Sequence, residues 1–472
     1  MLVKGLRRIL PAVGTLLVLV LCGLYFHSNI LAGPPQTEHV PQKIDQNPHP
    51  IPPPSNPPVT TANDHDDDDA FGALDAHMAS KYHQVYSVST ADRKYFPISF
   101  GDYEAMNPSI LPHPSLENTW IIVAQQQKSS IEHSVWFAEL VCNAVFKDGV
   151  LQCIKPPIIL PIAATPSDSG KCTGDLEYFT FNIGPHDARV FYGPDVPYAV
   201  YGSNSQHTCF GQWMLDFRTL VDWGFEPFSP AEFRQATELQ RPAPWATIEK
   251  NWFIFWDKHG QLYAHYDISP HRVFAKLDHS GSVISQNLAP AAASTDSKCM
   301  QKYLPQIPAA AAAGHLESIH QATNSLSITL CARSDPTCTP TDDNTFIMTI
   351  FQHKSYYAFH SVYEPYVMLF KQTAPFAIHA ISSKPIWIHG RGKQGQGRKP
   401  EMLTPEAEKG WDQTEMVYVT SLSWRDRGRK YHGYSDDVLF VGFGIEDETT
   451  AGIDVLAGEL VGELGLCSAV SQ

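Results

Sequence analysis

The sequence lacks any concentration of positive charge that would suit a nucleic-acid partner. Its 472 residues include 34 Lys and Arg against 49 Asp and Glu, which gives a formal net charge of −15. Nucleic-acid binding needs clustered cations that neutralise phosphates, so we expect no nucleic-acid partner. Hydrophobic residues make up 43% of the chain and aromatic residues 11%, enough to fill a core and to exclude global disorder.

Several short functional motifs are also absent. The chain contains no G-x-S-x-G elbow, P-loop, H-E-x-x-H or dinucleotide fingerprint, so those enzyme classes gain no support. No C-x-x-C pair or histidine spacing suggests zinc, and we expect no metal site. Asn-x-Ser/Thr sequons are missing too, so glycosylation signals give no indication of location.

The N-terminus predicts a membrane anchor. Lys4, Arg7 and Arg8 precede an uncharged apolar stretch over residues 9–26, close to the shortest length that spans a bilayer. The positive-inside rule keeps residues 1–8 in the cytosol and sends the rest into the lumen. A cleaved signal peptide is the alternative, but no small-x-small cleavage site directly follows. We therefore expect a single-pass type II protein, and a Golgi membrane location fits this layout.

Residues 27–78 are predicted to form an extended stem. They contain "PHPIPPPSNPP" and "DHDDDD", a composition that cannot bury enough apolar surface to fold. The acidic run could suggest an Asp-x-Asp metal motif, but a solvated charge run is the better interpretation within a low-complexity stem.

The cysteines predict disulfide bonds. One of the nine, Cys22, lies in the apolar stretch, which leaves eight for an oxidising compartment. Cys142 and Cys153 flank a predicted hairpin with its turn at Asp148-Gly149, so they could join neighbouring strands. Another pair, Cys331–Cys338, could close a small loop.

From residue 79 to 472 the pattern predicts an all-β domain. Short apolar and aromatic runs such as "TWIIVAQQ", "NWFIFWD" and "TFIMTIFQ" recur between Gly, Pro, Asn and Asp. Helical periodicity is convincing only in "SPAEFRQATELQ" (229–240), and "AAAAAGHLESIH" is a weaker candidate. A five-bladed β-propeller with blades of about 70–80 residues accommodates this many strands. Two tandem sandwiches are the alternative, although no linker-like composition separates them.

Polar residues recur at the strand boundaries about once per expected blade. Any single one is ordinarily a solvated loop residue, but strand ends nearest a propeller axis converge on one pocket. Aromatic side chains beside carboxylates and guanidinium groups suit a sugar site. The candidates are Asn107, Asp187, Arg189, Glu249, Lys250, Asn251, Trp252, His353, Arg425, Asp426, His432 and Asp447.

These stretches, taken in order, resemble the five-bladed-propeller β-mannoside phosphorylases and hydrolases and the related β-1,2-mannosyltransferases. The resemblance rests on Asn107-Pro108, "GPHDAR", "EKNW", "FQHKS" and "FGIEDETTAGIDV", spread sparsely over about residues 100–461. It implies that Asp187 is the catalytic carboxylate, acting directly or through a sugar hydroxyl. Arg189, Lys250, Asn251 and Asp447 would then line a mannose subsite.

The sequence also departs from that family. The family usually has Glu-Asp-Pro-Arg, whereas this chain has His186 before the acid and Ala188 after it. No set of cations for inorganic phosphate can be assigned, which speaks against phosphorolysis. The basic loop "GRGKQGQGRK" (390–399) is the one concentrated positive segment and could meet an anionic donor or acceptor.

The leading functional prediction combines the anchor, the stem and the resemblance. It is a Golgi-type β-mannosyltransferase that moves mannose from a nucleotide sugar such as GDP-mannose to a glycan acceptor, with no further cofactor. Asp187 would be the base, and Arg189, Lys250 and Arg425 would meet the donor's negative charge. The alternatives are a membrane-anchored β-mannoside hydrolase or phosphorylase, and a non-catalytic carbohydrate-binding propeller.

Overall fold

The computed structural model describes residues 78–127, 137–165, 170–181, 184–224, 232–307, 316–401, 403 and 408–470. The predicted cytosolic tail, the apolar anchor and the stem up to residue 77 lie outside these ranges. Within the ranges, no helix has the length and apolar character that a bilayer crossing requires.

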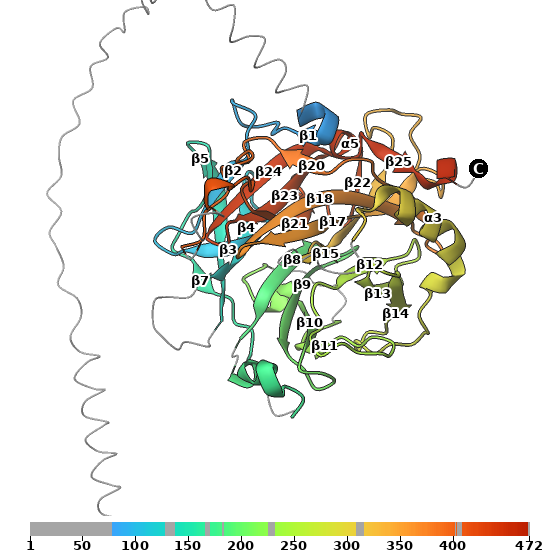
Figure 1. Ribbon diagram of the computed structural model, residues 1–472, viewed down its shortest axis with the longest axis horizontal. Coiled ribbons are helices and arrows are strands. Elements are labelled where there is room, and N and C mark those ends of the chain that lie inside the picture. Colours follow the sequence, from blue (N-terminus) through green and yellow to red (C-terminus); the bar gives the residue numbers. More distant parts are fainter. Residues whose placement is uncertain are drawn as a thin grey trace, which may run out of the picture. The chain divides into compact units, whose positions relative to one another are not determined.

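The described chain is all-β and is arranged as sheets around a nearly closed ring, which confirms the predicted fold class at this level. Colour in Figure 1 runs from the blue strands through green and yellow-green to orange, and the red strands return beside the blue ones. The first two blades of this ring are antiparallel. The first contains β3 (Ala105–Pro112), β4 (Trp120–Gln126), β5 (Glu139–Lys147) and β6 (Val150–Cys153). The second contains β8 (His186–Tyr192), β9 (Pro197–Asn204), β10 (Phe210–Asp216) and β11 (Thr237–Glu238).

The remaining three blades follow in chain order. The third has three strands, β12 (Phe253–Trp256), β13 (Leu262–Asp267) and β14 (Val273–Lys276). The fourth contains β16 (Ser325–Thr329), β17 (Thr345–Tyr357), β18 (His360–Lys371) and β19 (Ile378–Ser382). The fifth contains β21 (Val417–Trp424), β23 (Val438–Ile445), β24 (Thr449–Leu456) and, from the other end of the described chain, β2 (Phe96–Ser99).

Shorter elements complete the sheets and cover their edges. The short strands are β1 (His83–Val85), β7 (Ile158–Ile159), β15 (Leu316–His320), β20 (Ile386–Ile388), β22 (His432–Tyr434) and β25 (Leu464–Leu466). The helices include α3 (Ala293–Tyr303) and α5 (Ala457–Leu460), and the 3-10 turns include η1 (Gly174–Phe181), η2 (Phe217–Thr219), η3 (Ala289–Ala292) and η4 (Cys467–Val470).

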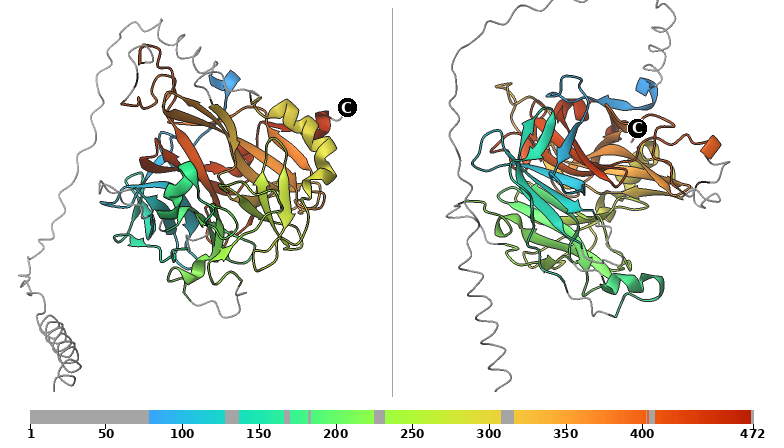
Figure 2. Two further views of the ribbon diagram at one scale, coloured as in Figure 1. Left: turned by 60° about the horizontal axis from the view of Figure 1, so that its bottom comes forward. Right: turned by 90° about the vertical axis from the view of Figure 1, so that its left-hand side faces the viewer.

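Strand β2 joins the last blade to the first. It pairs antiparallel with β24, where Phe96 lies opposite Gly452, and parallel with β6, where Ile98 lies opposite Leu151. The views in Figure 2 show the blue, cyan and red strands packed side by side. This pairing covers the edge that β24 would otherwise expose, which is how a ring of sheets avoids open edges.

Neighbouring blades are also joined by neutral polar side chains near the ring centre. The Ser109 hydroxyl accepts a hydrogen bond from the Val190 amide at 3.0 Å, and the Ser421 hydroxyl donates to the Pro108 carbonyl at 2.7 Å. The Asn324 amide both donates to and accepts from the Leu422 backbone, at 3.0 and 2.9 Å. These contacts satisfy backbone groups of the innermost strands that no sheet partner reaches.

The sequence predicted the strands better than the helices. The predicted helix over residues 229–240 is wrong in its described part, because Phe233 is buried with φ of 54° and Thr237–Glu238 form β11 against β10. The weaker candidate ends in strand β15 and not in a helix. Helix α3 was not predicted, and its contacts are tertiary: Asp296 accepts from Arg272 at 2.6 Å, and Cys299 bonds Cys467. Packing overrode local propensity at each place.

Both suggested disulfides are confirmed. Cys142–Cys153 crosses the β5–β6 hairpin, whose two-residue turn has positive φ at Asp148 and Gly149, as a type I′ turn requires. Cys331–Cys338 closes the small loop. Two further disulfides, Cys172–Cys209 and Cys299–Cys467, join segments far apart in the sequence, which is why spacing alone did not indicate them.

Closure of the ring should depend on Phe96. Its ring is 1% exposed, lies edge-on to Phe146 and Phe440, and occupies the space over Gly452. We expect Phe96→Ala to lower the free energy of unfolding by about 3–5 kcal/mol, measured by urea denaturation. Val88→Ala, at a side chain that is 43% exposed, is the control and should change it by less than about 0.5 kcal/mol. Equal small effects would show that β2 does not hold the ring closed.

Candidate functional site

The amino ends of the innermost strands share an unusual backbone feature. Asn107, Asp187 and Asn251 have φ of 58°, 50° and 63°, and they stand at the beginnings of β3, β8 and β12. Strands β3 and β8 carry β-bulges there, between Met106 and Ser109 and between His186 and Arg189. Asn and Asp tolerate this left-handed region better than other non-glycine residues, and bulges commonly redirect side chains beside active sites. We call this end of the strands the amino rim and the opposite end the carboxyl rim.

The Asp187 carboxylate is held on one side only. Its Oδ1 accepts a hydrogen bond from the Asn107 side-chain amide at 2.8 Å, and its backbone N–H donates to Gln125 Oε1 at 2.9 Å. Gly444 leaves room for Asn107, since a β-carbon there would lie 2.6 Å from Asn107 Oδ1. No described residue donates to Oδ2 of the half-buried Asp187. One oxygen is thus oriented and the other can meet a ligand.

Arg189 does not pair with Asp187. Its buried guanidinium donates to the Ala322 carbonyl and to Gln212 Oε1, both at 3.0 Å. Burial lowers the pKa of Arg189, and the bulge between the two residues breaks the simple alternation that would place both side chains on one face. The structure therefore gives Arg189 a role between blades, linking β8 to the segment before β16.

The hairpin of β17 and β18 brings a lysine and a tyrosine to the same region. Lys354 lies opposite Tyr363, with its ammonium 5.4 Å from the ring centre, and the Tyr363 ring lies 4.7 Å from that of Tyr418 at the start of β21. Desolvation and the negative charge of Asp187 raise the pKa of Tyr418. We call Asn107, Asp187, Lys354, Tyr363, Tyr418 and Asp447 the rim cluster.

Charges within the rim cluster act on one another. Asp447 lies in the β23–β24 turn with φ of 53°. The residue as a whole is exposed, but partial desolvation of its carboxyl group, followed by the Asp187 charge, raises the pKa of Asp447. Desolvation lowers the pKa of Lys354, while Asp447 partly opposes that shift. Desolvation, together with the positive charges of Lys354 and Lys250, lowers the pKa of His320 to about 4. Carboxylates, ammonium groups and phenols therefore share one environment.

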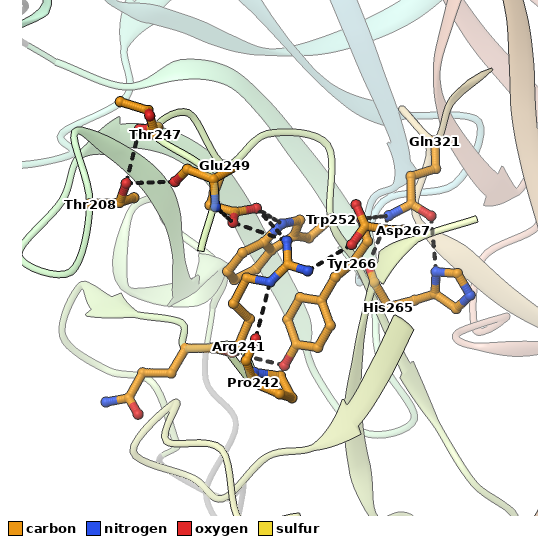
Figure 3. Close-up of polar contacts among 12 residues, drawn as sticks. Thr208, Arg241, Pro242, Thr247, Glu249, Trp252, His265, Tyr266, Asp267 and Gln321 are labelled. Carbon is orange, nitrogen blue, oxygen red and sulfur yellow. Dashed lines mark hydrogen bonds and ion pairs between the residues drawn. The ribbon is translucent and has the colours of Figure 1, made fainter. Parts of the chain in front are cut away.

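Other candidates from the third blade belong to its packed interior. Glu249 is 3% exposed, and its carboxylate accepts from Arg241 at 2.8 and 2.9 Å, from the Ala246 amide at 2.7 Å and from the Trp252 indole at 3.1 Å. Figure 3 shows Arg241 between Glu249 and Asp267, beside the Tyr266 ring. These contacts support "EKNW" as a structural element; within it, Lys250 is exposed and Asn251 half-buried.

His353 lies next to Lys354 in β17 but has other partners. Its Nε2 lies 2.8 Å from Glu317 Oε2, and its Nδ1 lies 4.0 Å from Glu364 Oε2. Burial opposes its charged form, but the hydrogen bonds with Glu364 and Glu317 raise the pKa of His353. Successive residues of a strand point to opposite faces, so Lys354 and not His353 joins the rim cluster.

Three candidates lie at the carboxyl rim. Arg425 and Asp426 line a cavity of 1160 Å³ with Trp120 and Asp454. They directly follow β21, whereas Tyr418 lies at its start, so about 20 Å of strand separates them from Tyr418. His432 lies opposite Ser327 and contacts Thr329 at the end of β16. The structure does not bring these residues to Asp187.

The basic glycine-rich loop has its charges largely compensated. Arg391 is buried and donates to the Glu415 carbonyl and the Thr414 hydroxyl. Arg398 pairs with Glu448, and Lys399 lies 3.5 Å from Glu408. A hollow of 230 Å³ beside the loop is lined by Arg398 and Asp447, so the loop borders the rim cluster without offering it several free cations.

Sequence reasoning missed several residues that the fold brings to Asp187, namely Gln125, Glu139, Tyr363 and Tyr418. Tyr363 and Tyr418 look like ordinary strand aromatics, and Glu139 is a single acid within an apolar run. The one available signal concerned Lys354: alternation along β17 places its side chain on the opposite face of the strand from that of His353.

The proximity of Lys354 to His320 can be tested directly. Replacing Lys354 by Met removes a positive charge, so the pKa of His320 should rise from about 4 while staying below its ordinary value, because desolvation is the larger cause. Histidine ring NMR signals followed against pH would measure the change, with His320→Gln for assignment. Lys258→Met, at a lysine paired with Asp342 on another part of the surface, should leave the signal unmoved. An unchanged His320 in Lys354→Met would contradict the geometry.

Comparison with known proteins gives only remote structural similarity. No protein-family model matches the chain, and no curated protein matches it in sequence. Similar solved structures include a β-1,2-mannobiose phosphorylase from Listeria innocua, 10% identical, which covers 80% of this chain and 98% of its own at a TM-score of 0.43. A GDP-Man-dependent mannosyltransferase from Leishmania mexicana is 8% identical and covers 82% and 94% at a TM-score of 0.38. Similarity this remote does not assign an activity.

Proposed function

We propose that the chain is a carbohydrate-active enzyme that cleaves β-mannosides at the rim cluster. The observation that carries this proposal is the pair Asp187 and Asp447, two carboxyl groups of the rim cluster, of which the charge of Asp187 helps to raise the pKa of Asp447. Glycoside hydrolysis ordinarily uses one carboxyl group as acid and one as base or nucleophile. The ordered motifs from Asn107-Pro108 to "FGIED" support a mannoside as the sugar.

The two carboxyl groups have different environments, which suggests different roles. The pKa of Asp447 is raised by desolvation and by Asp187, so Asp447 is suited to hold a proton and give it to the leaving oxygen. Asp187 Oδ1 is oriented by the hydrogen bond from Asn107, and its Oδ2 is available to activate water or to attack the sugar carbon. Tyr363 and Tyr418 provide aromatic faces beside these groups.

Hydrolysis fits the described residues better than phosphorolysis. A phosphate nucleophile needs several cations around it, and the rim offers Lys250 and Lys354. The nearby guanidinium groups of Arg189 and Arg391 are buried and donate to protein acceptors. Phosphate would therefore meet fewer positive charges than its own charge favours.

A β-mannosyltransferase is the second candidate function. It is favoured by the two ammonium groups, since Lys250 and Lys354 both act on His320 and could stabilise the departing nucleotide of a donor such as GDP-mannose. In that reaction Asp187 would remove the proton from a glycan acceptor hydroxyl. The apolar segment at 9–26 and the Pro-rich stem support a type II Golgi membrane location for such an enzyme.

Product analysis separates these functions. The protein would be incubated with β-linked mannobioses, then with the same sugars plus phosphate, and then with GDP-mannose plus a mannoside acceptor. Free mannose without phosphate indicates hydrolysis, mannose phosphate indicates phosphorolysis, and GDP with a longer glycan indicates transfer. We expect Asp187→Asn to lower kcat/KM about 10²–10⁴-fold in whichever reaction occurs.

The control for that substitution is Asp343→Asn, at a side chain that is 99% exposed near the start of β17. It should keep wild-type turnover. Full activity in Asp187→Asn would contradict the assignment of Asp187. Sugar binding without any turnover, retained in both variants, would instead identify a non-catalytic carbohydrate-binding propeller.

A further inference from the structure

Glu139 is a buried carboxyl group directly behind the reactive region. It begins β5, lies opposite Gln125 of β4 and is 0% exposed. Its Oε1 accepts the Ala188 amide at 3.0 Å, and its Oε2 has no hydrogen-bond partner among the described residues. A buried carboxyl oxygen without a partner calls for an explanation, because ionised carboxylates are almost always paired when buried.

The Ala188 contact belongs to a set that holds the free edge of β8. Three amides in the bulge region donate to side chains of the first blade: Asp187 to Gln125 at 2.9 Å, Ala188 to Glu139 at 3.0 Å, and Val190 to Ser109 at 3.0 Å. The other two acceptors, an amide oxygen and a hydroxyl, are neutral. Glu139 is the only carboxyl group of the three.

Among the described residues, no cation compensates Glu139. The strands of its own blade that lie beside it, β3, β4 and β7, contain no titratable residue. Strand β8 brings His186, Asp187 and Arg189, of which Asp187 is a like charge. The Arg189 guanidinium donates to Ala322 and Gln212, and the His186 ring lies tilted against the Phe137 ring, with 3.7 Å between their centroids. An ionised Glu139 would therefore place an unpaired negative charge beside a second one.

We propose that Glu139 works as a neutral carboxylic acid, a positioning residue that keeps its proton and holds the bulge from which Asp187 reaches the substrate. The value of this arrangement for catalysis rests on the proposed function, but the protonation state does not. The neutral form accepts the Ala188 amide as an amide side chain would. Glutamine should therefore replace Glu139 well, and alanine should not.

The electrostatics give the sign of the pH effect. Burial, and then the charge of Asp187, raise the pKa of Glu139 well above its ordinary value, while the Ala188 hydrogen bond opposes the shift. In the unfolded chain Glu139 ionises near its ordinary pKa. Its contribution to stability is thus fully present below that ordinary pKa and is lost as the pH rises toward the pKa of the folded state.

Two measurements without substrate test whether Glu139 is protonated. Infrared spectra of the protein at pH 7 should show the carbonyl band of a protonated carboxyl group that is lost in Glu139→Gln and kept in Asp447→Asn. The Tm of Glu139→Gln should rise relative to wild type as the pH increases from 5 to 8. Glu177→Gln, at an exposed glutamate, should track wild type. A missing band, or parallel Tm curves, would overturn the proposal.

A variant of Asp187 keeps the test decisive if Glu139→Gln does not fold. Asp187→Asn removes the neighbouring negative charge, which lowers the pKa of Glu139. As the pH is raised, the infrared band should therefore disappear at a lower pH than in wild type. A band that does not respond would belong to another group and would contradict the assignment.

Turnover then tests the positioning role, using whichever activity the protein shows. Glu139→Ala should lower kcat by about 100-fold, as expected when a reactive group is displaced by about 1 Å. Glu139→Gln should restore most of it with an unchanged pH profile. Loss in both variants would show that the carboxyl group itself takes part in chemistry, against the proposal. Failure of the proposed function would leave the infrared and Tm results standing.

Discussion

The structure depends on how the innermost strands satisfy the backbone groups that face away from their own sheets. The inner strands β3, β8, β12 and β21 each have one edge without a sheet partner, and unpaired buried amides or carbonyls are costly. Side chains of the adjoining blades meet these groups: Ser109 and Glu139 accept from β8, Ser421 donates to the β3 backbone, and Asn324 pairs with Leu422. The same contacts fix how far one blade slides along the next and therefore bring the amino ends of the strands together.

Backbone geometry and chemistry coincide at those amino ends. A left-handed backbone conformation costs asparagine and aspartate less than most other non-glycine residues, and Asn107, Asp187 and Asn251 all adopt it. The residue types that tolerate the conformation are also ones that bind hydroxyl groups or move protons. The bulge in β8 directs Asp187 toward Asn107 and separates it from Arg189, whose guanidinium instead joins two blades.

Neighbours in sequence proved less informative than position along a strand. Glu249 accepts hydrogen bonds from Trp252 and Arg241 inside the third blade. Between Glu249 and Trp252, Lys250 is exposed and Asn251 is half-buried. Lys354 and His353 are adjacent but point to opposite faces of β17. The charge of Asp447 affects the pKa of Lys354, whereas His353 contacts Glu317. Arg425 and Asp426 follow the same strand that begins near Tyr418, so a whole strand length separates them from the rim cluster.

The sequence by itself determined the all-β class and the β5–β6 hairpin with its disulfide, and it singled out Asn107 and Asp187, whose side chains the fold brings into contact. These depend on local signals: alternation, turn residues, cysteine spacing and short polar motifs at strand ends. Only the tertiary structure decided that β2 closes the last blade, that residues 237–238 are a strand, and that Glu139, Tyr363 and Tyr418 lie around Asp187. The reason is physical: such partners are brought together by contacts between blades, and no local pattern of the chain specifies which distant side chain will complete a buried hydrogen bond.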